Sequence, residues 1–465
     1  MANRSLEARF NETAAKSQAL RKRLGLNIRE RVVKDIYLQA HEIAEKAVKL
    51  PETGIDPSHK IDNIITSKIF GYPLMIAMLS LIFWLTITGA NYPSELLANL
   101  LFGFEDRLTW FFQWVGAPDY LHGALVLGMY RGLAWVVSVM LPPMAIFFPL
   151  FTFLEDLGYL PRVAFNLDNI FKKAGAHGKQ ILSMCMGFGC NAAGVIACRI
   201  IESPRERLVA VLTNNFVPCN GRFPLLITMA AVFLGLMVNG YNNLAASVVV
   251  AGAVVLGILV TLAVSWTLSK TILKGMPSTF TLELPPYRWP KIGTLLVRSV
   301  FDRTLFVLRR AVAVAAPAGV VIWILANTQI GEVSLLAHLA GRLQSFGYLL
   351  GLDGYIILAF LLGLPANEIV VPILIMSYLS EGAMLEFDSI AALHRLLVNN
   401  GWTWLTALNM LLFSLFHFPC ATTLLTIRKE TQSAKWTLLA ALIPTIVGCL
   451  VCLVITQFVR VMGLV

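Results

Sequence analysis

The chain has 465 residues, of which 57% are hydrophobic and only 14% charged, and its formal net charge is +10. Soluble domains carry about 25% charged residues, so this composition excludes an ordinary soluble protein and predicts a polytopic membrane protein. Many of the Lys and Arg residues precede the first apolar segment, and the positive-inside rule therefore places the N-terminus in the cytoplasm. The N-terminal segment lacks an early apolar core, so we expect no signal peptide. No aromatic stacking motif accompanies the basic residues, which argues against nucleic-acid binding.

The first 122 residues predict an arm, a span and a loop. Residues 1–60 are expected to form a helical arm, because apolar side chains from Ile28 to Tyr37 recur at helical spacing between charged ones. A first span is predicted at residues 69–90. Residues 91–122 mix acidic residues, prolines and aromatic side chains, and they predict an interfacial loop with short amphipathic helices.

The next segment, residues 123–154, is apolar except for Arg131 and contains Pro142-Pro143. It is longer than the ~20 residues of one span but short for two, so a short or re-entrant segment followed by a full span is predicted. The acidic pair Glu155-Asp156 follows the last residue of this apolar segment. An amphipathic stretch at 159–178 follows, and its basic residues indicate a cytoplasmic side.

Several of the remaining apolar segments are interrupted by Gly, Pro and polar residues. Unbroken spans are predicted at 244–268, 305–326 and 436–458, with a polar cytoplasmic connection at 269–303. Broken segments are predicted at 180–200, 208–236, 355–379 and 402–427. The predicted fold is an all-α polytopic membrane protein of about eight spans plus broken or re-entrant helices. Its predicted parts are a cytoplasmic helical arm (1–60), the first span with the interfacial loop (61–122), a first half (123–270), a polar cytoplasmic connection (271–303) and a second half (304–465).

The interruptions occur in matching pairs, which predicts two related halves. Gly187-Phe188-Gly189-Cys190-Asn191 parallels Gly363-Leu364-Pro365-Ala366-Asn367. Phe216-Val217-Pro218-Cys219 parallels the stretch that ends in Phe418-Pro419-Cys420. Paired interrupted segments in corresponding positions of two halves are a pointer to the substrate site of a transporter.

Polar side chains gather at these interruptions. They are Cys190, Asn191, Asn214, Asn215, Cys219, Asn220, Asn367, Glu368, His417 and Cys420. Thiolate and imidazole suit transition metals, whereas an all-oxygen site favours Mg²⁺ or Ca²⁺. The mixed set therefore predicts a borderline divalent metal such as Fe²⁺ or Mn²⁺. A few ligands of mixed hardness also suit release of the ion better than a closed zinc site of four thiolates.

Structural roles compete with these functional ones. Asn191 and Asn367 are also placed to cap the half-helices that they begin. His417 is equally compatible with an ordinary interior histidine, and Glu155-Asp156 with solvation of a helix end. Glu368 differs, because a carboxylate inside a membrane segment is costly and is a functional candidate by default. Enzyme classes are disfavoured, since the sequence contains no P-loop, HExxH or GxSxG motif.

The chain resembles the membrane part of the ferrous iron transport protein B family over about residues 60–460. The motifs that carry the resemblance keep their order along the chain. They are Leu154-Glu155-Asp156-Leu157-Gly158-Tyr159, His177-Gly178-Lys179, Gly187 to Asn191, Asn215 to Pro224, Leu308-Arg309-Arg310-Ala311, Glu368-Ile369-Val370-Val371, Pro419-Cys420-Ala421-Thr422 and Lys429-Glu430-Thr431.

This resemblance implies a Gate-type transporter that moves Fe²⁺ into the cytoplasm across the bacterial inner membrane. The expected transport path comprises Cys190, Asn191, Cys219, Asn367, Glu368 and Cys420. The expected metal ligands are Cys190, Cys219, Glu368 and Cys420, and the secondary path candidates are Glu155, Asp156, Asn215 and His417. The metal is expected as substrate, with no permanently bound cofactor.

Two departures from the family affect the predicted mechanism. The family's N-terminal GTP-binding domain is missing, and residues 1–60 resemble only the helical stalk that follows it. GTP is therefore not expected on this chain, and a separate GTPase and small accessory proteins are candidate partners besides the bilayer, as is a second copy of the chain. Asn367 stands where the family commonly has Lys, which leaves Glu368 without a partner nearby in sequence. Three alternatives stay open, namely an organic solute such as a nucleoside, Mn²⁺, and a non-transporting membrane partner that docks a GTPase.

Overall fold

The computed structural model describes residues 13, 16, 28–47, 57–67, 69–176, 178–238, 243–274, 286–380, 382–384 and 390–464. The chain divides into two compact units, Met1–Asn63 with Ser278–Glu283, and Ile64–Pro277 with Leu284–Val465. In the first unit, helix α2 (Ile28–Ala47) confirms the helix predicted from the Ile28 to Tyr37 pattern. The rest of the predicted arm lies mostly outside the described residues, as do His177 of the resemblance and residues 275–285 of the predicted connection.

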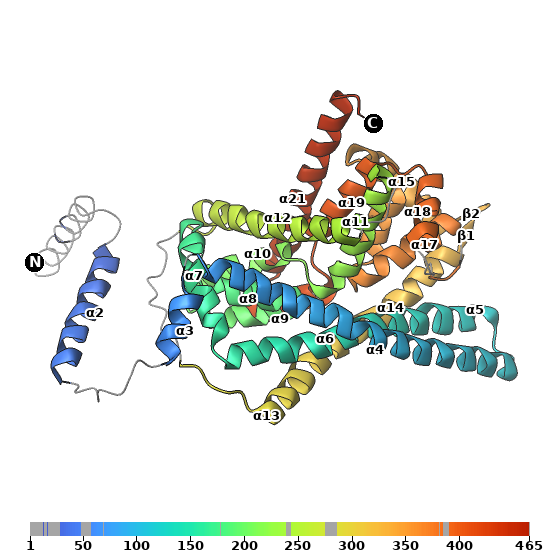
Figure 1. The fold of residues 1–465 in the computed structure, drawn as a ribbon. Helices are drawn as coiled ribbons and strands as arrows, with labels where there is room; N and C mark the ends of the chain where they lie inside the picture. Colours follow the sequence, from blue (N-terminus) through green and yellow to red (C-terminus); the bar gives the residue numbers. More distant parts are fainter. Residues whose placement is uncertain are drawn as a thin grey trace, which may run out of the picture. The chain divides into compact units, whose positions relative to one another are not determined.

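The second unit is built almost wholly of helices (Figure 1). Its described strands are β1 (Gln329–Ile330) and β2 (Val333–Ser334), an antiparallel pair. The helices up to the connection are α3 (Pro57–Ile65, which begins in the first unit), α4 (Gly71–Val115), α5 (Asp119–His122), the π-helix η1 (Gly123–Tyr130), α6 (Arg131–Asp156), α7 (Tyr159–Lys173), α8 (Gln180–Gly189), α9 (Asn191–Ala197), η2 (Cys198–Ile200), α10 (Pro204–Thr213), η3 (Asn214–Phe216), η4 (Asn220–Arg222), α11 (Phe223–Val238) and α12 (Asn243–Lys270).

The helices after the connection form the second half. They are α13 (Ile292–Val297), the π-helix η5 (Arg298–Leu305), α14 (Phe306–Asn327), α15 (Leu335–Leu349), α16 (Gly354–Leu362), η6 (Asn367–Ile369), α17 (Val370–Leu379), α18 (Ile390–Asn399), α19 (Trp404–Phe416), α20 (Ala421–Thr431) and α21 (Ala434–Val461).

The all-α polytopic class is confirmed, but the span number is lower than predicted. By length and apolar composition, six helices within the described residues can cross a membrane. A seventh is added if α15 and α16, which meet at a bend of 110°, count as one broken span. The short apolar helices around the breaks account for the rest of the predicted eight, because none of them is long enough to span alone.

The predicted interfacial loop at 91–122 is wrong. Helix α4 continues through Pro93 to Val115 and has 45 residues, about 68 Å at 1.5 Å per residue. Its carboxylate at Glu105 is buried and forms an ion pair with Arg131, with Nη2 and Oε1 2.5 Å apart. The pair neutralises the acidic residue that suggested a loop, and membrane helices tolerate an internal proline.

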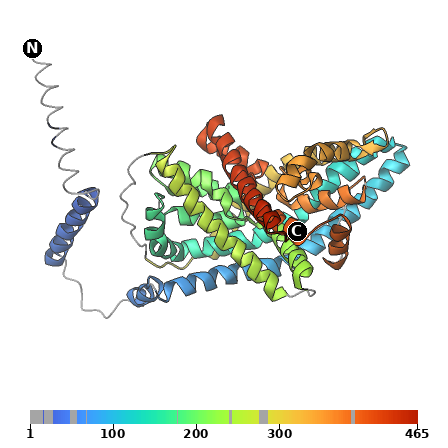
Figure 2. The same cartoon turned by 90° about the horizontal axis from the view of Figure 1, so that it is seen from above.

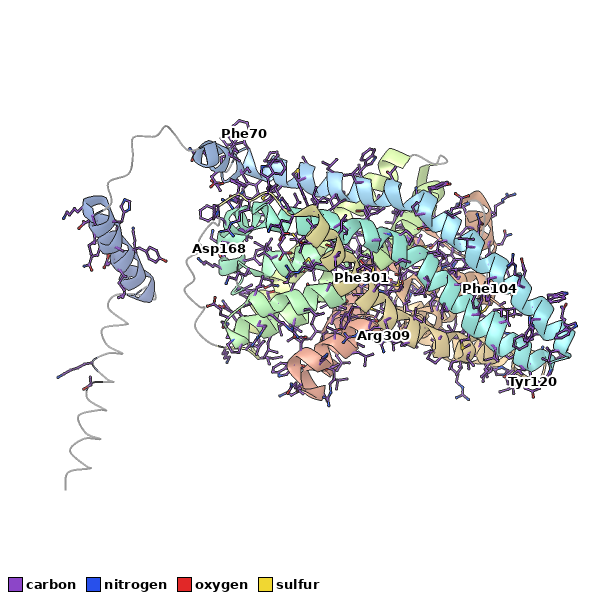
Figure 3. All side chains as sticks on the ribbon, turned by 90° about the horizontal axis from the view of Figure 1, so that it is seen from below. Phe70, Phe104, Tyr120, Asp168, Phe301 and Arg309 are labelled. Atoms are coloured by element: carbon purple, nitrogen blue, oxygen red, sulfur yellow. The ribbon has the colours of Figure 1, made fainter. Side chains whose placement is uncertain are left out.

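The predicted re-entrant segment at 123–154 is also wrong. The chain is helical without a gap from Asp119 to Asp156, with Pro142 and Pro143 inside α6. This helix runs beside α4 in the views of Figure 1 and Figure 2. Figure 3 shows Phe70 and Asp168 toward one end of the second unit, and Phe104 and Tyr120 toward the opposite end.

Three smaller boundaries also differ from the predictions. The span predicted to begin at 305 is part of a helix that begins at Ile292, so the end of the predicted polar connection is helical. Residues 327–354, which separate the predicted segments 305–326 and 355–379, contain α15. The helix that contains the start of the segment predicted at 208–236 begins earlier, at Pro204, because Ser203 caps α10 and Pro204 occupies its first position.

The backbone supports the predicted relation between the halves. Cys190, between α8 and α9, has φ −155° and ψ 124°. Ala366, just before η6, has φ −153° and ψ 127°. Each extended residue precedes a buried Asn, so the same break recurs at matching places in the two halves.

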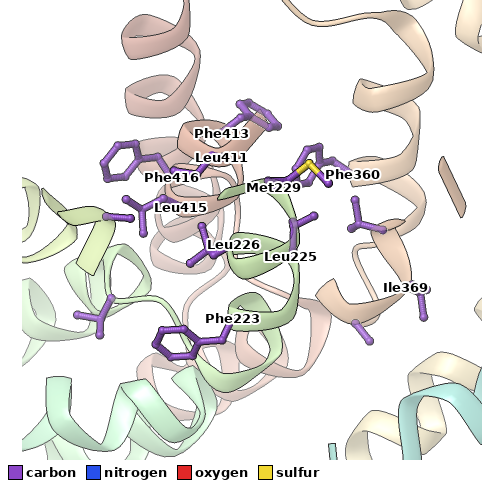
Figure 4. Packing of buried hydrophobic residues seen from close by; sticks show 14 of the residues in the cluster. Phe223, Leu225, Leu226, Met229, Phe360, Ile369, Leu411, Phe413, Leu415 and Phe416 are labelled. Carbon is purple, nitrogen blue, oxygen red and sulfur yellow. The ribbon is translucent and has the colours of Figure 1, made fainter. Parts of the chain in front are cut away.

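The core of the second unit holds these breaks in place. In Figure 4, Leu226 and Met229 of α11 lie near residues of α19 and Phe360 of α16. Phe360 packs edge-on against Phe413, with ring centroids 4.9 Å apart. The two halves therefore share one apolar core around the breaks.

Candidate metal-binding cavity

All six residues predicted to line the transport path border one cavity of about 30 Å³. Cys190, Asn191 and Cys219 come from the breaks of the first half. Asn367, Glu368 and Cys420 come from those of the second. Four broken segments thus converge on a space with room for about one water or ion.

The break at Cys190 is fixed by close packing. Helix α8 ends at Gly189, where a side-chain carbon would overlap the ring of Phe147 on α6. The Cys190 amide donates to Met186 O at 3.1 Å, and the Cys190 carbonyl accepts from Gly194 at 2.9 Å. Because the residue is extended, both helix ends stop beside the cavity and the thiol borders it.

The cavity has a sulfur-rich part. The thiols of Cys190, Cys219 and Cys420 border it, and Cys420 Sγ lies 3.3 Å from Thr423 Oγ1. The other four cysteines do not line this cavity. Cys198 and Cys452 instead donate to carbonyl oxygens of their neighbours, as expected of packing residues. The thiols that border the cavity therefore all come from the breaks.

Among the described residues, Glu368 is the only acidic one that lines the cavity. The residue is 9% exposed, and no other described residue forms an ion pair or a side-chain hydrogen bond with it. A buried carboxylate without a counter-charge is costly in a membrane protein. A cation in the cavity would supply the missing counter-charge.

The ligands do not form a preassembled coordination shell. Across the described residues, no three His, Cys, Asp or Glu side chains converge closely enough to hold a metal ion. The candidate ligands border the cavity from several sides instead. Such an arrangement differs from the closed tetrahedral shell of a structural zinc site.

A buried polar network lies behind the cavity and joins the halves. Arg222 is fully buried and donates to the carbonyls of Asn215, Leu415, His417 and Phe418 at 2.9–3.2 Å, and also to Asn215 Oδ1. Asn215 also donates to His417 O at 2.8 Å. The secondary candidates Asn215 and His417 thus belong to the layer that supports the cavity.

The other two secondary candidates lie elsewhere. Glu155 lines a larger cavity of about 600 Å³, hereafter the vestibule, which shares Val307 with the small cavity. Asp156 lines a separate pocket beside Arg288 and Lys291. At the vestibule, Arg199 of the first half forms two hydrogen bonds of 2.7 Å with Glu430 of the second.

Several cavity residues were absent from the predicted site. Thr422 Oγ1 is buried, has no hydrogen-bond partner and belongs to a residue that lines the cavity. Met140 and Met144 of α6 border it with their thioether side chains. Thr422 follows Cys420 by two residues and was within the quoted motif. The methionines lie in an unbroken apolar helix, and nothing in their local sequence separates them from packing residues.

Gly221 provides a way to move the Glu368 carboxylate without replacing it. A side-chain carbon at Gly221 would overlap that carboxylate. We expect Gly221→Ala to displace the carboxylate and to reduce metal uptake at least severalfold while the protein still inserts. Gly341→Ala is the matched control, because nothing lies within 4 Å of the added carbon there. Equal uptake by both variants would show that the position of the carboxylate is unimportant.

The fold and cavity define a class, a polytopic helical membrane protein with two halves whose paired broken helices enclose a small polar site. The model for the Gate family, described as "Nucleoside recognition", matches residues 137–233 and 308–434. The model for "Ferrous iron transport protein B C terminus" matches residues 250–302. The chain belongs to the ferrous iron transport protein B family, of which it represents the membrane part.

Relatives agree with this placement. A protein named Fe(2+) transporter FeoB from Staphylococcus aureus is 34% identical over 402 residues, 84% of this chain and 57% of that protein. One of the same name from Methanocaldococcus jannaschii is 28% identical over 91% of this chain and 62% of its own length. An Fe(2+) transport protein A/Fe(2+) transporter FeoB fusion protein from Porphyromonas gingivalis is 28% identical over 81% of this chain and 48% of its own length.

The chain therefore spans less than two thirds of the length of these relatives. No solved structure matches it.

Proposed function

We propose that the chain carries Fe²⁺ across the membrane through the small cavity. The observation that carries the proposal is the convergence of three thiols, two amides and one carboxylate from four broken segments. Thiol ligands favour Fe²⁺ over the harder Mn²⁺, and the oxygen ligands keep the site from being purely soft. The relatives' names point to the same metal.

The size of the cavity argues against an organic solute. Pockets for small organic molecules occupy about 300–1,000 Å³, whereas the space among the breaks is about 30 Å³. The vestibule is larger, but it contains none of the three thiols. An ion is therefore favoured over a nucleoside at the point where the halves meet.

The vestibule is the proposed connection between the cavity and the cytoplasm. Basic residues surround this end of the protein, including Lys179, which pairs with Glu202, and Arg199, Arg310 and Lys429 in the vestibule lining. The positive-inside rule assigns such an end to the cytoplasm. Glu155 and Glu430 offer carboxylates there to an ion that leaves the cavity.

A GTPase is a proposed partner of this chain, and GTP hydrolysis is proposed to drive transport. The small accessory protein is a second proposed partner, because one relative is named as a fusion with Fe(2+) transport protein A. The N-terminal helical segment on the cytoplasmic side would be the docking element for the GTPase.

Uptake of radiolabelled Fe²⁺ into proteoliposomes under anaerobic, reducing conditions tests the proposal. The full chain is assayed alone and with the GTP-binding domain of a relative, and unlabelled Mn²⁺ and uridine serve as competitors. We expect saturable Fe²⁺ uptake that Mn²⁺ inhibits weakly and uridine leaves unchanged. Absence of Fe²⁺ uptake under both conditions, or inhibition by uridine, would refute the proposal.

A further inference from the structure

The His417 ring lies at the break of the second half and touches the cavity residue Asn367. Its Nδ1 lies 2.9 Å from Ser414 O and 3.2 Å from Phe413 O. Its Nε2 lies 3.1 Å from the terminal amide of Asn367, at the Oδ1 position. Both ring nitrogens are thus engaged, one by backbone carbonyls and the other by a residue that lines the cavity.

The hydrogen on the ring can be assigned from these partners. Carbonyl oxygens only accept hydrogen bonds, so Nδ1 must carry a hydrogen. The ring packs between Phe360 and Phe418, with centroids 4.8 and 5.2 Å away. The guanidinium of Arg222 also binds the His417 carbonyl. A second positive charge is disfavoured in this apolar and already cationic setting, so the ring is neutral and Nε2 is an acceptor.

A neutral Nε2 requires a donor from Asn367. The oxygen and nitrogen of a terminal amide exchange places by a half-turn about the Cβ–Cγ bond, and their positions follow from the hydrogen-bond network. With Nδ2 of Asn367 toward His417, the amide oxygen takes the place that Nδ2 held before the half-turn. The amide atom at that position has no hydrogen-bond partner among the described residues, and Asn367 lines the cavity.

We infer that His417 is a positioning residue that turns the Asn367 amide oxygen toward the transported ion. The inference rests on the proposed function and adds to it a determinant of metal selectivity. An amide oxygen fixed next to the Glu368 carboxylate adds a second hard ligand to a cavity that three thiols also border. The site then discriminates against purely soft ions such as Cd²⁺ in favour of Fe²⁺.

The first half has no histidine that orients the corresponding asparagine, Asn191. Phe216 occupies the place in the repeat that corresponds to His417, and amides hold Asn191 instead. Asn191 donates to Asn215 Oδ1 at 3.3 Å, and after a half-turn it would donate to Asn214 O and Val217 O at 3.3 Å. Amide and carbonyl groups of its own half thus hold Asn191, whereas a neutral histidine fixes the orientation of the Asn367 amide.

The test compares Cd²⁺ and Fe²⁺ uptake by His417→Phe, which copies the first half and retains an aromatic ring. We expect the Cd²⁺ to Fe²⁺ uptake ratio to rise about tenfold, since the loss of a group that orients a metal ligand typically changes metal affinity 10–100-fold. His417→Gln retains an acceptor for the amide and should restore most of the wild-type ratio. Thermal unfolding in detergent verifies that the variants are folded.

Asn367→Leu provides a second route, because it removes the same oxygen without changing the histidine. This variant should raise the Cd²⁺ to Fe²⁺ uptake ratio to a similar extent. The double variant should have a ratio no higher than that of either single variant. An unchanged ratio in folded His417→Phe, or additive effects in the double variant, would overturn the inference. A wild-type protein that transports neither metal would instead refute the proposed function.

Discussion

Replacement of Glu368 by Gln is expected to reduce Fe²⁺ uptake at least about tenfold, because it removes the only carboxylate bordering the small cavity. Glutamine has nearly the same shape and still offers an amide oxygen, so packing around Gly221 should persist. The reduced uptake of Fe²⁺ would therefore arise from the loss of the negative charge. The measurement is initial uptake rate in proteoliposomes as a function of Fe²⁺ concentration.

Glu332→Gln is the matched control for this change. Glu332 lies between β1 and β2, where it is exposed, and it lines none of the cavities described above. Its replacement should leave uptake unchanged. If Glu368→Gln transports Fe²⁺ as fast as the control, the carboxylate has no part in the path and the assignment of the cavity is wrong.

Replacement of Arg222 by Met is expected to destabilise the protein by roughly 3–5 kcal/mol, because several buried acceptors would lose their donor at once. The guanidinium binds Asn215 and the carbonyls of Leu415, His417 and Phe418, and so joins the two halves. Lysine should not restore stability, since its three donors on one nitrogen cannot reproduce the planar fork of arginine.

The thermal midpoint and the monodisperse yield in detergent measure this effect. Arg342→Met is the control, because Arg342 is exposed on α15 and forms no ion pair with any described residue. We expect the control to behave as wild type and Arg222→Met to be largely misfolded. A folded Arg222→Met protein with a wild-type midpoint would show that the network behind the cavity does not hold the halves together.

The breaks could be predicted because their causes are local. Glycine and a following asparagine mark the end of one half-helix and the start of the next, and the structure has extended backbone at Cys190 and Ala366, within these breaks. Polar residues at such breaks are few, so all six path residues were named from the sequence and border one cavity.

The wrong predictions concern residues whose interaction partner lies far away in the sequence. Glu105 suggested a loop, but Arg131, 26 residues away, neutralises it within packed helices. Likewise, the relation between His417 and Asn367 spans 50 residues. No local pattern distinguishes a histidine that orients an amide from a histidine that binds a metal. The fold around the cavity was predictable from periodicity, whereas the layer that supports it was not.

The most direct test of the metal site is the iron K-edge absorption spectrum of the purified chain loaded with Fe²⁺ under anaerobic conditions. A mixed first shell is predicted, with sulfur from Cys190, Cys219 or Cys420 at about 2.3 Å and oxygen at a shorter distance. The sulfur scattering should disappear when these three residues are replaced by serine, and it should persist in Cys449→Ser, whose thiol lies on α21 outside the cavity. A first shell of light atoms only in the wild-type protein, unchanged in the triple variant, would contradict the account.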